Sequence, residues 1–199
     1  MILITGANGF LGRHIVNSLN DRVLSLLVRG SANQHSKHKI FTNEINGVND
    51  FGQALLGCKT IIHCAARVHL MDDNASNRLD LYREVNVEGT LNLAKQAFKA
   101  GVKRFIFVSS IKVNGESTHI GKPFTYSDIR EPQDPYGVSK SEAEYQLIEL
   151  SKGTGLEVVI IRPTLVYGPG VKANFASLMN LVSKGVPLPL DVLLRINAV

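Results

Sequence analysis

Short apolar runs alternate along this chain with longer segments in which apolar residues recur every three or four positions. Apolar runs bounded by glycine or polar residues are typical of buried strands, and the longer spacing predicts helices. Strands are expected near Met1–Thr5, Val23–Val28, Lys39–Ile45, Thr60–Cys64, Arg104–Ser109 and Glu157–Arg162. Helices are expected near Phe10–Leu19, Phe51–Leu56, Leu79–Ala100 (stopped by Gly101), Tyr136–Lys152 and Asn174–Lys184. Such alternation predicts an α/β fold, a doubly wound parallel sheet with helices on both faces.

A glycine-rich turn, Thr5-Gly-Ala-Asn-Gly-Phe-Leu-Gly12, follows the first expected strand at once. Gly6 would permit the tight turn, Gly9 would let the backbone approach a pyrophosphate, and Gly12 would let the helix pack close to the strand. Free N–H groups at the helix start favour an anion. The spacing differs from the Gly-x-Gly-x-x-Gly of most dehydrogenases, and a purely structural turn is the alternative. The context of strand, turn and helix favours a Rossmann-like dinucleotide site.

Tyr136 and Lys140 are spaced one helical turn apart in Asp134-Pro-Tyr-Gly-Val-Ser-Lys140, so they would share a helix face. Free tyrosine has a pKa near ~10 and is a poor base at neutral pH. A neighbouring ammonium favours the phenolate, so we expect a lowered pKa for Tyr136. The pair could then exchange a proton with a sugar hydroxyl or ketone. Such pairs are also common on exposed helices, and this is the alternative.

Six segments together carry a resemblance to a known family. They are Thr5-Gly-Ala-Asn-Gly-Phe-Leu-Gly12, His63-Cys-Ala-Ala66, Asn86-Val-Glu-Gly-Thr90, Phe107-Val-Ser-Ser110, Tyr136-Gly-Val-Ser-Lys140 and Arg162-Pro-Thr-Leu-Val-Tyr-Gly-Pro169. The chain resembles the extended short-chain dehydrogenase/reductases, in particular the NAD-dependent epimerase/dehydratase group that acts on nucleotide-diphosphate sugars. The resemblance runs from Met1 to about Leu190. It implies an NAD(P)-binding Rossmann domain at 1–170 and the start of a substrate-binding lobe at 171–199.

The expected site residues follow from the resemblance together with the patterns described in this section. The catalytic ones are Ser110 (with Ser109 as alternative), Tyr136, Lys140 and Asn86, and the substrate-binding ones are Ser110, Tyr136, Asn174 and Phe175. The cofactor-binding ones are Gly6, Asn8, Gly9, Phe10, Leu11, Gly12, Arg29, Ala65, Ala66, Tyr136, Lys140 and Pro163. Asn86 would support a water relay to the lysine. Structural alternatives are a strand-end cap for Ser110, a helix-interior amide for Asn86 and a helix N-cap for Asn174.

The choice of cofactor depends on the end of the second strand. An acidic residue there would accept the ribose hydroxyls of NAD. The chain instead reads Leu27-Val28-Arg29-Gly30, and a guanidinium pairs well with the 2′-phosphate of NADP. Arg29 could equally be a loop charge, and the resemblance implies NAD, so NAD or NADP is expected.

Two absences narrow the chemistry. The resembling dehydratases carry an Asp-Glu pair after the catalytic Ser or Thr, where this chain has Ile111 and Lys112. This argues against a 4,6-dehydratase. The six histidines show no metal-ligand spacing, so no metal is expected, and a core or strand-end role is expected for His63.

The composition of the chain limits the classes of binding partner and the compartment that we expect. A net charge of +5 could suggest nucleic acid, but the basic residues are scattered, so no nucleic acid is expected. No apolar run is long enough to span a membrane. With the first strand at Met1 there is no room for a signal peptide, and Cys58 and Cys64 suit reduced thiols. A cytoplasmic protein is therefore expected.

Three functions follow. The first is a nucleotide-sugar 4-epimerase, acting through transient oxidation at C4 of a UDP-hexose or UDP-N-acetylhexosamine. The second is an NADPH-dependent 4-ketoreductase of a UDP-4-keto-6-deoxy sugar. The third is an inactive dinucleotide-binding remnant, because Asp191–Val199 departs from the family and the resemblance implies a further lobe of roughly a hundred residues, as expected at domain scale. Apolar surface that this lobe would cover could promote association, so a homodimer is a further expectation.

Overall fold

The computed structural model describes residues 1–30, 37–68, 78–171 and 173–185. In this part of the chain six parallel strands form one sheet in the order β3-β2-β1-β4-β5-β6. The strands are β1 (Ile2–Thr5), β2 (Ser25–Val28), β3 (Lys39–Thr42), β4 (Thr60–His63), β5 (Arg104–Val108) and β6 (Glu157–Ile161). The strand order reverses between β1 and β4, the place where open α/β sheets bind ligands.

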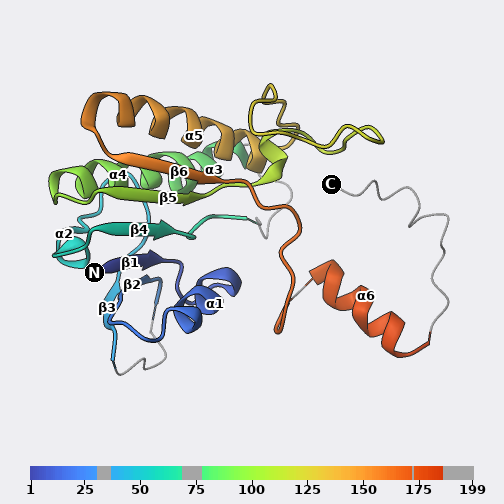
Figure 1. Cartoon of the computed structure of the whole chain (residues 1–199), viewed down its shortest axis with the longest axis horizontal. Coiled ribbons are helices and arrows are strands. Elements are labelled where there is room, and N and C mark those ends of the chain that lie inside the picture. Colours follow the sequence, from blue (N-terminus) through green and yellow to red (C-terminus); the bar gives the residue numbers. More distant parts are fainter. Residues whose placement is uncertain (31–36, 69–77, 172, 186–199) are drawn as a thin grey trace.

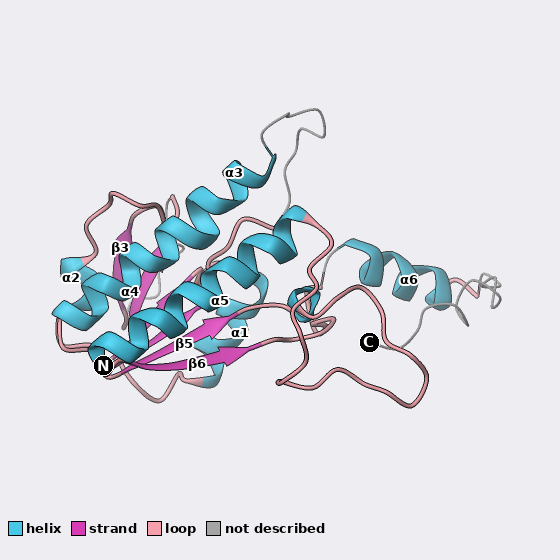
Figure 2. Ribbon diagram, turned by 90° about the horizontal axis from the view of Figure 1, so that it is seen from above, coloured by secondary structure: helices cyan, strands magenta, loops and turns pink. Residues whose placement is uncertain are grey.

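Helices cover both faces of the sheet (Figures 1 and 2). They are α1 (Phe10–Ser18), α2 (Gly52–Leu55), α3 (Arg78–Arg83), α4 (Thr90–Lys99), α5 (Pro135–Thr154) and α6 (Ala173–Ser183), with a π-helix η1 (Glu84–Gly89) and a 3₁₀-helix η2 (Ile111–Val113). On one face α1 buries Val16 among Ile4 and Leu26. On the other, α2, α4 and α5 pack on the sheet around Phe105 and Phe107. The predicted fold class, a Rossmann-like doubly wound parallel sheet, is confirmed.

Two elements differ from their predicted form. The third strand ends at Thr42 rather than Ile45, because the side chains of Asn43 and Asn46 accept hydrogen bonds from the backbone that follows and form a turn. The long helix expected over Leu79–Ala100 is interrupted by η1, a π-helical stretch that joins α3 to α4. Gly101, at a φ of 77°, follows the end of α4 as predicted.

His63 lies fully buried at the end of β4, in the structural place expected for it. Its Nδ1 is 2.7 Å from Thr5 Oγ1 on β1, and its Nε2 is 2.9 Å from Thr90 Oγ1 on α4. Burial, with a contribution from Lys140, lowers its pKa to about 3. A neutral histidine therefore joins the two central strands to the helical layer.

The end of the described chain adds little to this core. Helix α6 stands beyond the carboxyl ends of the strands, apart from the sheet in both views (Figures 1 and 2). Of the segment 171–199, residues 172 and 186–199 lie outside the described residues. No helix in the described part is both long and apolar enough to cross a membrane.

Candidate functional site

The glycine turn joins β1 to α1 at the point where the strand order reverses. Gly6 has a φ of 65°, and a Cβ there would lie 2.8 Å from the Ala65 nitrogen. A Cβ on Gly12 would lie 2.2 Å from the Gly6 oxygen. Side chains essentially never approach backbone this closely, so both positions require glycine. The turn therefore holds the start of α1 directly against the chain that leaves β4.

A cavity of about 340 Å³ opens beside this turn. It is lined from the ends of four strands and from η1. Six of the predicted cofactor-binding residues line it, namely Gly6, Asn8, Gly9, Arg29, Ala65 and Ala66. Phe10, Leu11 and Gly12 begin α1 behind the turn. The cavity therefore lies where the sequence predicts a dinucleotide site, beside the glycine turn and beyond the ends of the central strands.

Sequence reasoning missed several residues of this cavity. Asn43, Glu44 and Asn46 enter it from the end of β3, and Arg67 enters from the end of β4. Ligands of open α/β sheets lie beyond the carboxyl ends of the strands. This rule predicts a role for Arg29 after β2, and it applies equally to the end of β3. The apolar pattern extends the expected strand through Ile45. It therefore assigns Asn43 and Glu44 to the strand itself rather than to the loop that follows it.

Tyr136 and Lys140 lie on the first two turns of α5. Asp134 caps this helix, accepting from the Gly137 N–H at 2.6 Å, and Pro135 is its first residue. Lys140 is 2 % exposed, and its Nζ donates to the Val108 carbonyl at 2.8 Å and lies 4.3 Å from the centre of the Phe107 ring. The helix therefore points its lysine down onto the end of β5.

The prediction that Lys140 lowers the pKa of Tyr136 is wrong in this structure. Burial, reinforced by the carboxylate of Asp134, raises the pKa of Tyr136 to about 12. Lys140 is itself affected by burial, which lowers its pKa to about 7. A spacing of one turn shows that two side chains share a helix face, but their pKa values depend on burial and on the groups that each one reaches.

Asn86 lies in η1, 1 % exposed, and its amide is fully engaged. Its Oδ1 accepts from the Arg67 N–H at 2.8 Å, while its Nδ2 donates to the Arg67 carbonyl and to Ser139 Oγ, each at 3.0 Å. These contacts correspond to the amide-to-backbone alternative. The water relay stays a prediction, but Asn86 does join the chain after β4 to the residue that precedes Lys140.

Ser109 and Ser110 follow β5 and face different surroundings. Ser109 is buried and donates to Glu144 Oε1 at 2.5 Å. Ser110 is half-buried and caps η2, accepting from the Lys112 N–H at 3.3 Å. The structure thus commits Ser109 to an internal contact and leaves Ser110 the more accessible hydroxyl near the end of β5.

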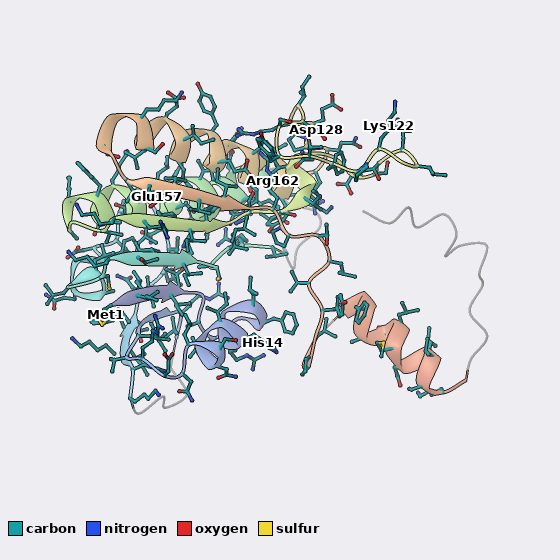
Figure 3. All side chains as sticks on the ribbon, viewed as in Figure 1. Met1, His14, Lys122, Asp128, Glu157 and Arg162 are labelled. Carbon is teal, nitrogen blue, oxygen red and sulfur yellow. The ribbon has the colours of Figure 1, made fainter. Side chains whose placement is uncertain are left out.

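A buried ion network that the sequence did not predict lies one turn beyond Lys140. Glu144, on α5, is fully buried and accepts from Arg162 Nη2 at 2.6 Å, with Arg130 Nε at 3.4 Å. Arg162, labelled in Figure 3, also donates to Asn114 Oδ1 at 2.9 Å. A buried carboxylate requires such partners. The network fixes the ends of β5 and β6 and the loop before α5 to one another.

The segment after β6 carries the remaining predicted residues. The Pro163 carbonyl accepts from the Ile111 N–H at 3.0 Å, which holds this segment beside η2. Phe175, in α6, stacks on Tyr167 with ring centres 5.2 Å apart. Asn174 belongs to the first turn of α6, and its side chain lies outside the described part. The structure thus ties Lys140 to the end of β5 at Val108, ties Asn86 to Ser139 beside that lysine, and places Ser110 just after β5, whereas α6 lies apart.

The chain is similar to several known proteins. Residues 2–188 match the family model described as "NAD dependent epimerase/dehydratase family". The chain is 56 % identical over 191 residues to a UDP-glucose 4-epimerase of Vibrio cholerae, covering 94 % of this chain and 58 % of the relative. It is 32 % identical to an N-acetyl-alpha-D-glucosaminyl-diphospho-ditrans,octacis-undecaprenol 4-epimerase of Escherichia coli O157:H7, covering 92 % of this chain and 54 % of the relative.

A solved structure similar to this one is MoeE5 in complex with UDP-glucuronic acid and NAD. It superposes with a TM-score of 0.78 at 27 % identity, covering 94 % of this chain and 62 % of that one. The chain thus spans little more than half the length of these two curated epimerases.

Proposed function

Because the chain belongs to the NAD-dependent epimerase/dehydratase family, we propose that the protein is an NAD-dependent 4-epimerase of a UDP-linked sugar. The substrate is a UDP-hexose or UDP-N-acetylhexosamine, and the reaction is transient oxidation at C4. The observation that carries the proposal is the 56 % identity to a UDP-glucose 4-epimerase along 94 % of this chain.

The residues of this chain supply binding and proton transfer. The nicotinamide of NAD, when bound, supplies the oxidation at C4 and the later reduction. The glycine turn presents free N–H groups of α1 to the pyrophosphate, next to the cavity at the strand ends. Tyr136 takes the proton of the C4 hydroxyl as the phenolate and returns it as the phenol, while Ser110 holds the same oxygen. Because the pKa of Tyr136 is about 12 in the free chain, this role requires that bound cofactor and substrate favour the phenolate. Lys140, tied to the Val108 carbonyl, secures α5 to the strand end that carries Ser110.

Arg29 favours a second candidate, an NADPH-dependent 4-ketoreductase. It lines the cavity beyond β2, where a carboxylate would favour NAD, and its guanidinium suits a 2′-phosphate. Glu44 lines the same cavity from β3 and opposes an added phosphate. The two candidates differ in their cofactor. An epimerase restores its NAD in each turnover, whereas a reductase consumes one NADPH.

The test begins by denaturing the purified chain and identifying any released dinucleotide. Retained NAD, with interconversion of UDP-glucose and UDP-galactose followed by NMR, is the expected result. Tyr136→Phe should lower turnover by about 100-fold or more while leaving NAD bound. Tyr145→Phe, on the same helix and 60 % exposed, is the control and should keep full activity.

Other outcomes separate the alternatives. Oxidation of NADPH by a 4-keto sugar without interconversion of epimers would select the reductase. Dinucleotide binding without any turnover would select the inactive remnant. A Tyr136→Phe variant with near-normal activity would remove the assigned role of this residue.

The proposal extends to compartment and assembly. Free thiols at Cys58 and Cys64 suit the reducing cytoplasm. Leu165 and Tyr167, after β6, are 65 % and 69 % exposed, and apolar side chains of this kind suit a homodimer contact. Light scattering on the purified chain tests this, because a monomer at all concentrations would refute it.

A further inference from the structure

The cavity beside the glycine turn is walled on one side by the loop of residues 43–51, which joins β3 to α2. Four residues of this loop line the cavity, namely Asn43, Glu44, Ile45 and Asn46. The last backbone hydrogen bond between the loop and the sheet runs from the Asn43 N–H to the Val28 carbonyl, at 3.0 Å. After that bond, the backbone of residues 44–50 is bonded to side chains within the described structure.

Two side-chain amides of α4 hold this loop from outside the cavity. Asn92 Nδ2 donates to the Asn46 carbonyl at 3.0 Å and to the Asn49 carbonyl at 2.8 Å. Gln96 lies one turn along, and its Nε2 donates to the Asn49 carbonyl at 2.8 Å and to Asn92 Oδ1 at 2.9 Å. Gln96 Oε1 accepts from the Phe51 N–H at 2.7 Å. Neither amide lines the cavity, so both act on it only through the loop.

The direction of these bonds is fixed by their chemistry. Each of the two NH₂ groups donates twice, which uses every hydrogen that it has. If the nitrogen and oxygen of Asn92 were exchanged, its oxygen would face two carbonyl oxygens. The pair is therefore a donor clamp on the loop, and an apolar side chain at either position cannot replace it.

The loop passes these contacts on to the residues that line the cavity. Asn46 Oδ1 accepts from the Asn49 N–H at 2.8 Å, and Asn49 Nδ2 donates to the Glu44 carbonyl at 2.9 Å. Helix η1 supports the same segment, since a Cβ on Gly89 would lie 2.6 Å from Ile45 Cγ2. The wall beyond β3 is thus set by the clamp of α4 and by contact with η1.

This wall is the part of the cavity that an adenine base would reach. A pyrophosphate at the glycine turn lies at the start of α1. The ribose of the adenosine half then lies at the end of β2. Strand β3 is paired with β2 through Val28 and Thr42, so a base that continues in the same direction lies against the loop that follows β3.

We propose that Asn92 and Gln96 are positioning residues for recognition of the adenine base: from outside the cavity they hold the loop backbone in the form that the edge of the base meets. The inference rests on the proposed binding of NAD in this cavity. A binding surface that is already ordered does not lose affinity to the ordering of a loop, and its polar groups can distinguish one base from another.

The test compares NAD with nicotinamide hypoxanthine dinucleotide by isothermal titration calorimetry on the full chain, freed of any retained dinucleotide. The two ligands differ only at the base, where the analogue carries an oxygen in place of the amino group and an N–H at N1. NAD should bind about 10-fold more tightly, because the analogue reverses the hydrogen-bonding groups of that edge. Asn92→Ala should reduce this preference to about 3-fold or less, because the loop loses its clamp. Lys95→Ala, at an exposed position of the same helix, is the control and should keep the preference of the wild type.

The ratio of the two affinities separates positioning from a merely structural effect. A general loss of stability weakens both ligands by the same factor and leaves the ratio as it was. An unchanged ratio in Asn92→Ala, or equal affinities in the wild type, would overturn the proposal. Gln96→Met covers a folding defect in Asn92→Ala, since it leaves both bonds from Asn92 to the loop and should also lower the ratio; a ratio unchanged in this variant would contradict the role of Gln96.

The same titrations distinguish this proposal from the proposed function. A wild-type chain that binds NAD with the expected preference but interconverts no sugar would refute the epimerase and leave the role of the clamp standing. A wild-type chain that binds neither dinucleotide would overturn both.

Discussion

Replacement of Lys140 by methionine should make the folded chain more stable. The ammonium of Lys140 is buried beneath α5, with the Val108 carbonyl and the Phe107 ring as its contacts. Burial lowers its pKa from 10.5 to about 7, which means that the folded state disfavours the charged form. Methionine has a similar length and an apolar end. The variant should therefore lose the site's lysine and gain stability.

The size of the effect follows from the pKa. A change from 10.5 to about 7 corresponds to about 4 kcal/mol of unfolding free energy at pH 7. The variant also leaves the Val108 carbonyl without its donor, which costs about 1–3 kcal/mol. A net gain of about 1–3 kcal/mol is expected at pH 7.

The direction in which stability changes with pH follows from proton binding. Between pH 7 and 10.5 the unfolded chain holds a proton at this lysine that the native chain has released, so the wild type gains stability as the pH rises. Lys140→Met should lack this rise. Urea unfolding at pH 7.0, 8.0, 9.0 and 9.5 measures it, below the range in which Tyr136 would contribute.

Lys152→Met is the control, since Lys152 lies on the same helix with its side chain 66 % exposed. It should keep the pH dependence of the wild type. The reasoning is refuted if Lys140→Met is less stable than the wild type at pH 7, or if it shows the same rise in stability toward pH 9.5.

Three further substitutions test the fold around the site. His63 is neutral in the folded chain, where its pKa is about 3, so below pH 6.5 only the unfolded chain binds a proton at this residue. The free energy of unfolding should therefore fall by about 2 kcal/mol between pH 7.5 and 5. His63→Asn should not show this loss, whereas His14→Gln, the control at an exposed histidine, should keep it. Gly12→Ala should destabilise the folded chain by about 1–3 kcal/mol or more in thermal unfolding and should weaken NAD binding. Gly153→Ala is the control, because its new methyl group meets no atom within 4 Å, and it should be neutral or stabilising in the same measurement. Glu144→Gln removes the fully buried carboxylate that pairs with the partly buried Arg162 and Arg130, and it should cost up to about 3 kcal/mol in urea unfolding. An unchanged midpoint would contradict the importance of this network.

The sheet and the glycine turn were predictable from the sequence because both depend on local patterns. Strands alternated with amphipathic helices, and Gly6 and Gly12 followed a buried strand at the required spacing. These features can be recognised from the local sequence alone, since a turn at φ 65° needs glycine whatever surrounds it.

The site's electrostatics depend on contacts that no local pattern encodes. Burial and Asp134 raise the pKa of Tyr136, and Lys112, 24 positions earlier in the sequence, acts in the opposite direction. The π-helix η1 likewise has no local signal, but Gly89 within it packs where a Cβ would lie 2.6 Å from the Ile45 side chain. Such contacts become visible only once the strands have brought distant segments together.

The order of synthesis delays the folding of the glycine turn. Thr5, just before it, is separated by 58 residues from His63, its partner across β1 and β4. A ribosome adds about 5–20 residues each second, so β1 waits roughly 3–12 s for its central neighbour. The backbone contact between Gly6 and Ala65 cannot form before then. The glycine turn can therefore reach its final form only after the residues between Gly6 and Ala65 have been added to the nascent chain.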